Sequence, residues 1–507
     1  MILSFFSLLL VASASILATL LLFRRKSSHK LPLPPSPKSD PIIGHARKIP
    51  SVDEHLVYAK LSKELNSDII SFTSLGQVFI ILNSAKAANE LLDRRSAKYS
   101  DRPELPIFLY SSLTDWTKNT GFVRYGERWR SQRRMSHAVL HKNASTQFWP
   151  LITRHSRLTM QRLIANPDNF VKEFRRMSGS TVLSAVYGYE VSSADDPLVK
   201  IVETAMAHVS EASVPGNFYV NTIPWLRFFP SWFPGTEWKQ KTKEWSTELH
   251  DMVNAPFDWT KEQIAKGVAR PSTVKSLLYE LENSPNTPDD LAEDIDRIKW
   301  ATAASDTSAA TAVVFILAMT LYPEIQAKAQ AEIDQVVGGN RLPEMEDRAS
   351  LPYLECVLKE VLRWQTVVPL GVPHTGIEDG EYAGYRIPKG AAVFSNIWAM
   401  SNDSSIYPNP EIFNPDRFLD PSVPYPRTFG FGRRSCPGIH MAESALFMNM
   451  TSLLAIFNIS PIRDDQGHDI PPRVEMRTNV LVSHPAEFKC SIKPRSQQAV
   501  KVLDSSV

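Results

Sequence analysis

The stretch Phe429-Gly430-Phe431-Gly432-Arg433-Arg434-Ser435-Cys436-Pro437-Gly438 contains the residues that decide how this chain folds. It places a single cysteine between glycines, beside two arginines and directly before a proline. Glycines permit backbone turns that a Cβ atom would forbid, and proline has no N–H near the sulfur. Nearby positive charge favours the thiolate, which is the metal-binding form of cysteine. The stretch therefore predicts a rigid loop that presents one thiolate to a metal, with an arginine available for an anionic group nearby.

The order of the defining residues is Phe-x-x-Gly-x-Arg-x-Cys-x-Gly, which are Phe429, Gly432, Arg434, Cys436 and Gly438. This order resembles the haem-binding loop of the cytochrome P450 family at every defining position. The resemblance implies haem b as cofactor, with Cys436 as the axial thiolate of its iron. Such a ligand donates electron density to haem iron and favours O–O cleavage. The alternative is a glycine turn that holds a small core cysteine.

Length, charge and cysteine content exclude several classes of protein. The chain has 507 residues and a formal net charge of +2, which argues against a nucleic-acid-binding protein. Its three cysteines, Cys356, Cys436 and Cys490, are far apart, so neither a structural zinc site nor a disulfide framework is expected. Few cysteines fit a reducing compartment such as the cytosol. Cys356 and Cys490 are expected to be small apolar core residues.

The N-terminus has the pattern of a membrane anchor. Residues 2–23 carry no charge and are long enough to cross a bilayer as a helix. Arg24, Arg25 and Lys26 follow at once, which predicts that this end stays cytoplasmic. A cleaved signal peptide is the alternative, but its positive charges would precede the apolar run. We expect an anchor over 2–23, a basic and proline-rich linker over 24–50, and a catalytic domain over 51–507.

The rest of the chain reads as one large domain. Helical periodicity dominates from about Val52, and β-like runs occur near 68–83, 382–394 and, more weakly, 480–493. The pattern predicts a mainly α fold with a small β portion. The resemblance implies the cytochrome P450 fold preceded by one transmembrane helix, in the endoplasmic reticulum membrane, single-pass, with the catalytic domain cytoplasmic.

One long helix is predicted from Pro288 to Tyr322. Thr287 can act as its N-cap, Pro288 suits the first helical position, and Pro323 ends it. Its second half is almost wholly apolar, so it is expected to be buried. The resemblance implies that this helix crosses the distal face of the haem.

Within that helix, Ala303-Ala304-Ser305-Asp306-Thr307 resembles the oxygen-activation motif of the family, although Ala304 stands where a glycine is usual. The resemblance implies that Asp306 and Thr307 deliver protons to oxygen. The alternative is structural: a threonine bonded to its own helix and an aspartate in a salt bridge.

Other segments resemble supporting motifs of the family. Trp129 and Arg133 lie four residues apart, so they share a helix face. The resemblance implies that Trp129, Arg133, His374 and Arg434 bind the haem propionates. It also implies a buried triad that supports the Cys436 loop, formed by Glu360, Arg363 and Arg417. Taken singly, each of these residues is as well explained by an ordinary core or turn role.

Two surface features concern partners. The aromatic and proline-rich run 223–235 favours contact with a membrane, and a core cluster is the alternative. Arg128, Arg130, Arg133 and Arg134 lie close to the presumed proximal side. Those that do not bind propionates are expected to steer an acidic partner, or else to form a solvated helix face.

The resemblance implies a monooxygenase that inserts one atom of O₂ into a lipophilic small molecule. No Gly-x-Gly-x-x-Gly unit for a nucleotide is found, so a separate NADPH-cytochrome P450 reductase is expected. The expected substrate walls are mostly apolar and are formed by 106–113, 301–304, 367–371 and 479–481. The chain also looks like fungal members of the family that oxidise terpenoids or polyketides. The alternatives are a haem-thiolate isomerase or dehydratase that needs no O₂, and a non-catalytic anchored haem protein.

Overall fold

The computed structural model describes residues 31–193, 195–213, 217–221, 223–283, 288–303, 307–478 and 481–506. The anchor predicted over 2–23 lies outside these residues, as do Ala304, Ser305 and Asp306. Thr287, the expected N-cap of the long helix, lies outside them as well.

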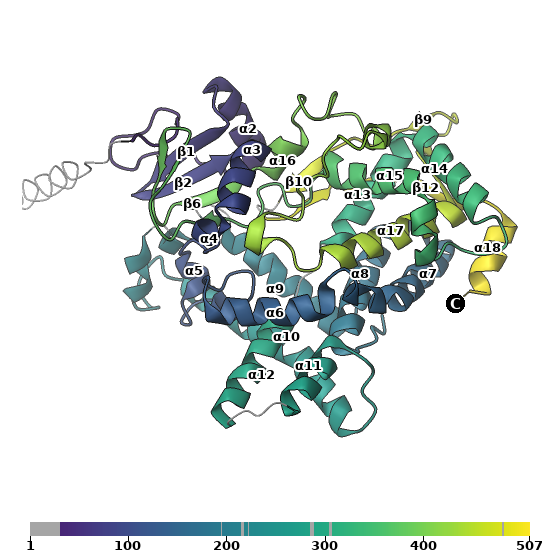
Figure 1. Cartoon of the computed structure of the whole chain (residues 1–507), viewed down its shortest axis with the longest axis horizontal. Coiled ribbons are helices and arrows are strands. Elements are labelled where there is room, and N and C mark those ends of the chain that lie inside the picture. Colours follow the sequence, from purple (N-terminus) through teal and green to yellow (C-terminus); the bar gives the residue numbers. More distant parts are fainter. Residues whose placement is uncertain are drawn as a thin grey trace, which may run out of the picture.

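Helices make up most of the described chain and surround a small sheet at one side (Figure 1). Their bounds are α2 (Glu54–Glu64), α3 (Ala85–Ala88), α4 (Ser96–Tyr99), α5 (Pro106–Leu109), α6 (Glu127–Leu140), α7 (Trp149–Ala165), α8 (Phe170–Tyr187), α9 (Pro197–Ser213), α10 (Trp238–Ala265), α11 (Thr273–Glu282), α12 (Pro288–Thr302), α13 (Ser308–Leu321), α14 (Pro323–Val336), α15 (Pro352–Trp364), α16 (Ile397–Ser401), α17 (Ile439–Ile456) and α18 (Gln497–Asp504).

The strands form a four-stranded sheet and several two-stranded ribbons. Strands β1, β2, β5, β6, β11 and β12 fall at the runs predicted from the sequence, whereas β3, β7, β8, β9 and β10 lie outside them. Their bounds are β1 (Ile69–Ser74), β2 (Gln77–Leu82), β3 (His374–Thr375), β4 (Gly380–Tyr382), β5 (Tyr385–Ile387), β6 (Ala392–Ser395), β7 (Phe457–Ser460), β8 (Ile462–Arg463), β9 (Asp469–Ile470), β10 (Met476–Thr478), β11 (Ser483–Pro485) and β12 (Ser491–Pro494). The sheet has the order β1-β2-β6-β3, and β2 and β6 pair in parallel while the other pairs are antiparallel. A mainly α fold with a small β portion is confirmed.

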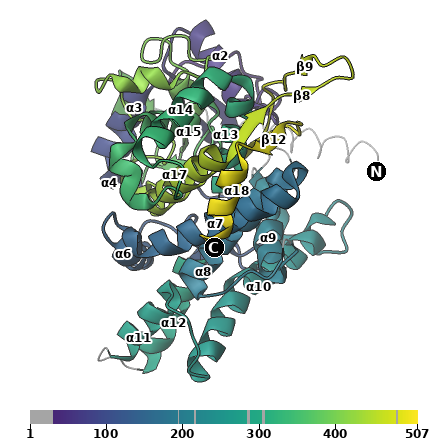
Figure 2. The same cartoon turned by 90° about the vertical axis from the view of Figure 1, so that its right-hand side faces the viewer.

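The core forms around α13. Every residue from Ala310 to Thr320 is buried, as the apolar second half of the long helix predicts. Helix α13 packs against α8, α15 and α17 in the main hydrophobic core. At the far end, α18 closes this core by packing on α7 and α17 (Figure 2). Cys356 and Cys490 are buried, as expected.

The prediction of one continuous helix from Pro288 to Tyr322 is wrong. Helix α12 ends at Thr302 and α13 begins at Ser308, and both Ala303 and Thr307 lie outside the two helices. Thr302 Oγ1 donates to the carbonyl oxygen of Ile298 at 2.8 Å, but Thr320 makes the same bond to Ile316 inside the unbroken α13, so this bond does not account for the interruption. The interruption falls on the segment that resembles the oxygen-activation motif.

The proline-rich segment before the domain lies against the sheet. The Ser71 N–H and hydroxyl donate to the carbonyl oxygens of Pro35 and Pro34, at 2.9 and 2.6 Å. The Arg386 N–H donates to the Pro32 carbonyl oxygen at 2.8 Å. Extended proline-rich backbone has free carbonyls, which these donors satisfy. The segment from residue 32 is thereby fixed to β1 and β5.

Among the described residues, α17 is the helix that is long and apolar enough to span a membrane. It is 61% buried inside the protein and packs against α7, α13 and α14. It is therefore a core helix, and α13 and α14 pass the same test only as a pair bent by 106°.

Candidate active site

The cysteine loop is shaped by a glycine that no other residue could replace without movement. Gly432 has φ +56°, and a Cβ built there would lie 2.0 Å from the carbonyl oxygen of Leu92. The Gly432 N–H donates to Asp93, which fixes the loop to the helical segment Asn89–Arg94. The Cys436 N–H donates to the Phe429 carbonyl oxygen at 2.8 Å, closing the loop. The thiol is thus held on a rigid turn directly before α17, as the sequence predicts.

Helix α6 contacts this loop through Arg133. Its Nη1 donates to the carbonyl oxygen of Ser435, the residue before Cys436, at 2.8 Å. Burial lowers the pKa of Arg133, and the charge of the Cys436 thiolate acts in the opposite direction. A cation therefore lies close enough to stabilise a thiolate at Cys436.

Arg434 donates to a group of three carbonyl oxygens. Its Nε, Nη1 and Nη2 donate to Ser100, Thr120 and Val123 at 2.8, 3.1 and 2.7 Å. Its Cζ lies 4.8 Å from the ring centroid of Trp129, which is itself buried. Burial lowers the pKa of Arg434 to about 10.

His374 lies near Arg434 and is neutral at physiological pH. Its Nδ1 donates to the Tyr99 carbonyl oxygen at 2.8 Å, which leaves Nε2 for another partner. Burial, followed by the charges of Arg102 and Arg434, lowers the pKa of His374 to about 3.

Arg102 belongs to the same group, and the sequence analysis missed it. It is 6% exposed, and its guanidinium donates to the carbonyl oxygens of Gly121, Val372 and Pro373 at 2.7–2.8 Å. Burial and the charge of Arg434 hold the pKa of Arg102 well below its usual range. The only signal in the sequence is an arginine before a proline, which is too common to single out.

The group formed by Arg102, Trp129 and His374, which are buried, and Arg434, which is partly buried, is hereafter called the cation cluster, and it requires negative charge. Carbonyl oxygens satisfy many of its N–H groups, but buried charge is costly unless an opposite charge compensates it. The pKa values of both arginines fall, because burial disfavours the charged form and, for Arg102, the charge of Arg434 adds to that effect. Two carboxylates near the Cys436 loop would relieve this cost. The donor set therefore fits the two propionates of a haem whose iron takes the Cys436 thiolate.

The expected substrate walls come together only in part. Ile107, Phe108 and Leu113 share one hydrophobic cluster with Ala303 and Leu481. Val367 packs in the main core instead and is joined to this region by the Ser483 N–H, which donates to its carbonyl oxygen at 2.8 Å. Ala304, Asn479 and Val480 lie outside the described residues. The described walls are apolar, which suits a lipophilic ligand.

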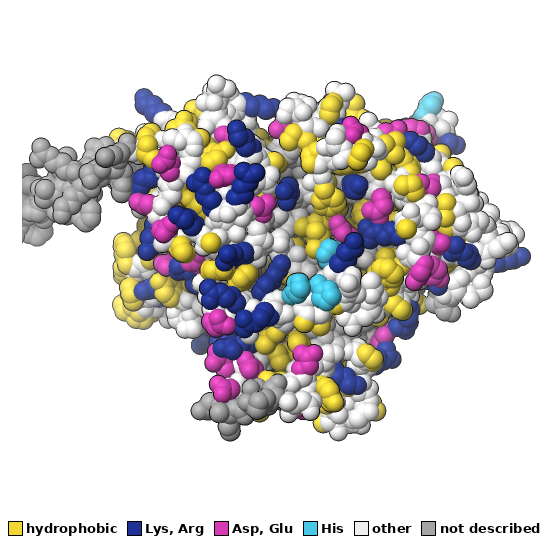
Figure 3. All heavy atoms as spheres, viewed as in Figure 1, with side chains coloured by type: hydrophobic (Ala, Val, Ile, Leu, Met, Phe, Trp, Pro, Cys, Tyr) yellow, Lys and Arg dark blue, Asp and Glu magenta, His cyan; other side chains and the backbone are white. Residues whose placement is uncertain are grey.

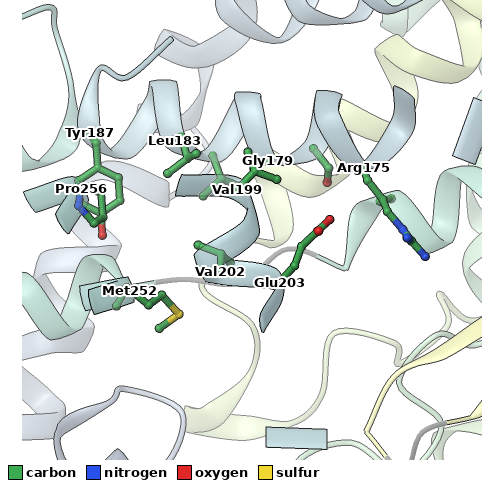
Figure 4. A pocket seen from close by; sticks show the side chains of 13 residues that line it. Arg175, Gly179, Leu183, Tyr187, Val199, Val202, Glu203, Met252 and Pro256 are labelled. Carbon is green, nitrogen blue, oxygen red and sulfur yellow. The ribbon is translucent and has the colours of Figure 1, made fainter. Parts of the chain in front are cut away.

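A separate cavity of about 90 Å³ lies between α8, α9 and α10 (Figure 4). Ala303 and Ala309, which flank Thr307 in sequence, form part of its wall. Arg175 and Glu203 line it as well, and they give it a polar side. Cys436 and the cation cluster do not line this cavity. Thr307 lies between α12 and α13, and the position of Asp306 is outside the described residues.

The buried triad predicted from Glu360, Arg363 and Arg417 is present. Arg363 donates twice to the Glu360 carboxylate, and Arg417 Nε donates to the same carboxylate at 3.2 Å. All three side chains are buried. The triad connects α15 to the 3₁₀ turn Pro415–Leu419.

Lys and Arg side chains gather on the face that α6 crosses (Figure 3). Of the four arginines on this part of α6, Arg128 pairs with Asp296 at 2.6 Å, and Arg133, which was expected at a propionate, donates to the cysteine loop. Arg130 and Arg134 are exposed and share Glu127, at 3.5 and 3.2 Å. These two remain available to an acidic partner.

Comparisons with known proteins agree with this arrangement. A model of the family described as Cytochrome P450 matches residues 34–491. Cytochrome P450 monooxygenase 208 of Postia placenta is 39% identical over 97% of this chain and 96% of its own length. The monooxygenases ple1 of Rhodocybe pseudopiperita and COX2 of Coprinopsis cinerea are each 40% identical, over 95% and 91% of this chain and 92% and 89% of their own lengths. The thiolate loop, the cation cluster and the matches across nearly the whole length lead to one conclusion: the chain belongs to the cytochrome P450 family of haem-thiolate monooxygenases.

Proposed function

We propose that this enzyme inserts one atom of O₂ into a lipophilic small molecule, by hydroxylation or epoxidation, with Cys436 as the axial ligand of its haem iron. The observation that carries the proposal is the cation cluster, which gathers beside the Cys436 loop from segments far apart in the chain. When bound, the haem supplies activation of O₂.

In this proposal the cation cluster binds and orients the propionates. Arg102 and Arg434 supply charge, and Trp129 supplies its indole N–H. His374 already donates through Nδ1 to the Tyr99 carbonyl oxygen, so its Nε2 would bind a propionate after taking up a proton, which a neighbouring carboxylate favours. Arg133 holds the peptide before Cys436 by its 2.8 Å hydrogen bond to the Ser435 carbonyl oxygen. Its positive charge keeps the sulfur in the thiolate form.

Thr307 and Asp306 are proposed to move protons. Thr307 would hold a proton at Oγ1 and Asp306 would replace it from solvent. The break between α12 and α13 supports this role, since a residue outside a helical ladder can turn its hydroxyl toward a ligand. The cavity walled by Ala303 and Ala309 offers water a place beside this segment.

The substrate is proposed to be an uncharged lipophilic scaffold, such as a terpenoid or polyketide of secondary metabolism. Apolar walls at Ile107, Phe108 and Leu481 support a lipophilic ligand, and the fungal origin of the relatives supports the metabolic setting. Electrons are proposed to come from NADPH through a separate reductase. Exposed Arg130 and Arg134 would attract such an acidic partner, with an affinity that falls as salt rises.

The chain is proposed to be held in the endoplasmic reticulum membrane by residues 2–23, followed by a linker over 24–50 and a cytoplasmic catalytic domain over 51–507. The uncharged run and the basic residues after it support this topology. Exposed aromatic side chains near Trp225 and Trp232 would give the domain a second membrane contact.

The test is the carbon monoxide difference spectrum of reduced membranes that carry the full chain. A strongly red-shifted Soret band is expected for the wild type and for Cys356→Ser, whose buried cysteine lies outside the site. Cys436→Ser should abolish the band. A band that survives in Cys436→Ser would contradict the ligand assignment, and no band in folded wild type would contradict the proposed function.

A further inference from the structure

Asp101 is a buried carboxylate that the proposed function does not use. Its side chain is 5% exposed, accepts three hydrogen bonds and forms an ion pair with Arg124. Arg124 donates to Oδ2 from Nε at 2.8 Å, and its Nη2 lies 2.6 Å away. The backbone N–H groups of Arg102 and Tyr125 donate to Oδ1 at 2.9 and 2.8 Å. A carboxylate so buried and so fully bonded is held in one place.

The backbone around Asp101 holds the cation cluster. The carbonyl oxygen of Tyr99 accepts from His374, and that of Ser100 accepts from Arg434, each at 2.8 Å. The carbonyl oxygen of Asp101 accepts from the Thr375 N–H at 2.9 Å. Arg102, the next residue, is itself a member of the cluster. Residues 99–102 therefore fix three of its four members.

The charge of Asp101 acts on the cluster. It raises the pKa values of Arg102 and Arg434, opposing the effect of burial on both. Burial alone would raise the pKa of Asp101, but the hydrogen bonds from Arg124 and the two amides outweigh it, so that pKa lies below its usual range. The carboxylate is thus ionised wherever the enzyme works, and it stands between the inner cations and Arg124 on the surface.

We propose that Asp101 is a positioning residue that sets the charge balance of the haem site and connects it to the outer face through Arg124 and Tyr125. This inference rests on the proposed function, because the cluster is taken to bind the haem. Asp101 and Arg124 form a neutral pair beside the cations. Removing either member would leave the charge of the other near the haem, and the two changes have opposite signs. Added positive charge favours the reduced iron, and added negative charge favours the oxidised iron.

The experiment measures the midpoint potential of the haem in the purified full-length holoenzyme. Asp101→Asn keeps the shape of the side chain and removes its charge, so the potential should become more positive. The matched control is Glu104→Gln, which removes a charge from the same Arg124 at 2.6 Å but on a side chain that is 75% exposed. Solvent screens that site, so the potential of Glu104→Gln should match the wild type.

Arg124→Gln provides the opposite test and keeps Asp101 in place. Arg124 is 50% exposed, so the chain tolerates its replacement, and the unpaired carboxylate should make the potential more negative. Shifts of opposite sign in the two variants support the proposal. If Asp101→Asn loses its haem, a more negative potential in Arg124→Gln alone supports it. Unchanged potentials, or shifts of the same sign, would overturn it. A wild type without a thiolate-type carbon monoxide band would instead overturn the proposed function itself.

Discussion

Arg363 binds Glu360 through two hydrogen bonds of 2.7 Å between side chains that are both fully buried. The same carboxylate accepts from Arg417 at 3.2 Å and from the Asn414 N–H at 2.8 Å. Arg363 also donates to the Ser401 carbonyl oxygen at 2.9 Å. The Glu360–Arg363 pair therefore joins α15 to segments about 40 and 55 residues further along the chain.

We predict that Glu360→Gln destabilises the protein by about 3–5 kcal/mol, because it leaves two buried guanidinium groups without their counter-charge. The free energy of unfolding in urea would measure the loss. Glu355→Gln is the matched control, since Glu355 lies on the same helix as Glu360. It pairs with Arg348, but both of these side chains are partly exposed. That variant should cost at most about 1 kcal/mol. Equal losses in the two variants would contradict the importance of burial.

Gly432→Ala should displace the cysteine loop. Alanine at φ +56° costs about 1–2 kcal/mol. The new methyl would also lie 2.0 Å from the Leu92 carbonyl oxygen, so the backbone must move. We expect reduced haem content and a weakened thiolate-type carbon monoxide band. Gly430→Ala pays the same backbone cost at φ +79° without a contact closer than 3.9 Å, so it should keep its haem. The idea fails if the two variants lose haem equally.

Local patterns in the sequence were sufficient for the parts of the site that depend on adjacent residues. The glycines around Cys436 predict a tight loop, and Gly432 and the Cys436 N–H form one. The spacing of Glu360 and Arg363 predicts a pair on one helix face, and the pair is present. Apolar composition predicts that α13 is buried, and it is.

Parts that depend on tertiary contacts could not be predicted in this way. Arg102 meets the Val372 carbonyl oxygen across 270 residues, and no local period encodes that contact. The role of Asp101 could not be predicted either, because it depends on the contact with Arg124 and on the cations that the neighbouring residues bind. Periodicity does not predict the break between α12 and α13, because it reports which face of a helix is apolar and not where the hydrogen-bond ladder stops.

His155 should make the protein less stable in acid. It is buried on α7 beside Ser184, and burial lowers its pKa to about 4 from a usual value near 6.5. Between these values the unfolded chain binds more protons, so stability rises with pH and is lost on acidification through this window. His155→Gln should therefore reduce the loss of unfolding free energy between pH 7 and pH 4 by up to about 3 kcal/mol. The difference in unfolding free energy between His155→Gln and the wild type at pH 8 reports the change in packing alone. An unaltered pH dependence would show that His155 does not titrate in this window.

The exposed aromatic residues of 219–233 should insert into lipid. Trp225, Phe228 and Trp232 are 58%, 73% and 80% exposed, while Phe229 is partly buried against Trp225 and Phe233. A soluble protein rarely exposes so many large aromatic side chains together, and tryptophan favours the membrane interface. Hydrophobic side chains also gather at the left edge of Figure 3, below the sheet that carries β1 and β2.

Brominated lipids quench tryptophan fluorescence only at short range, which makes them a direct measure of this contact. The full-length protein in vesicles of brominated lipid should be quenched, and Trp225→Phe/Trp232→Phe should lose most of that quenching. Trp364→Phe is the control, because Trp364 is buried in the core and should not contribute. Replacing Trp225, Phe228 and Trp232 by serine should in addition leave the carbon monoxide band intact, since none of them contacts the Cys436 loop or the cation cluster. Quenching that persists in the double phenylalanine variant would place this surface in water and would leave the anchor as the membrane contact.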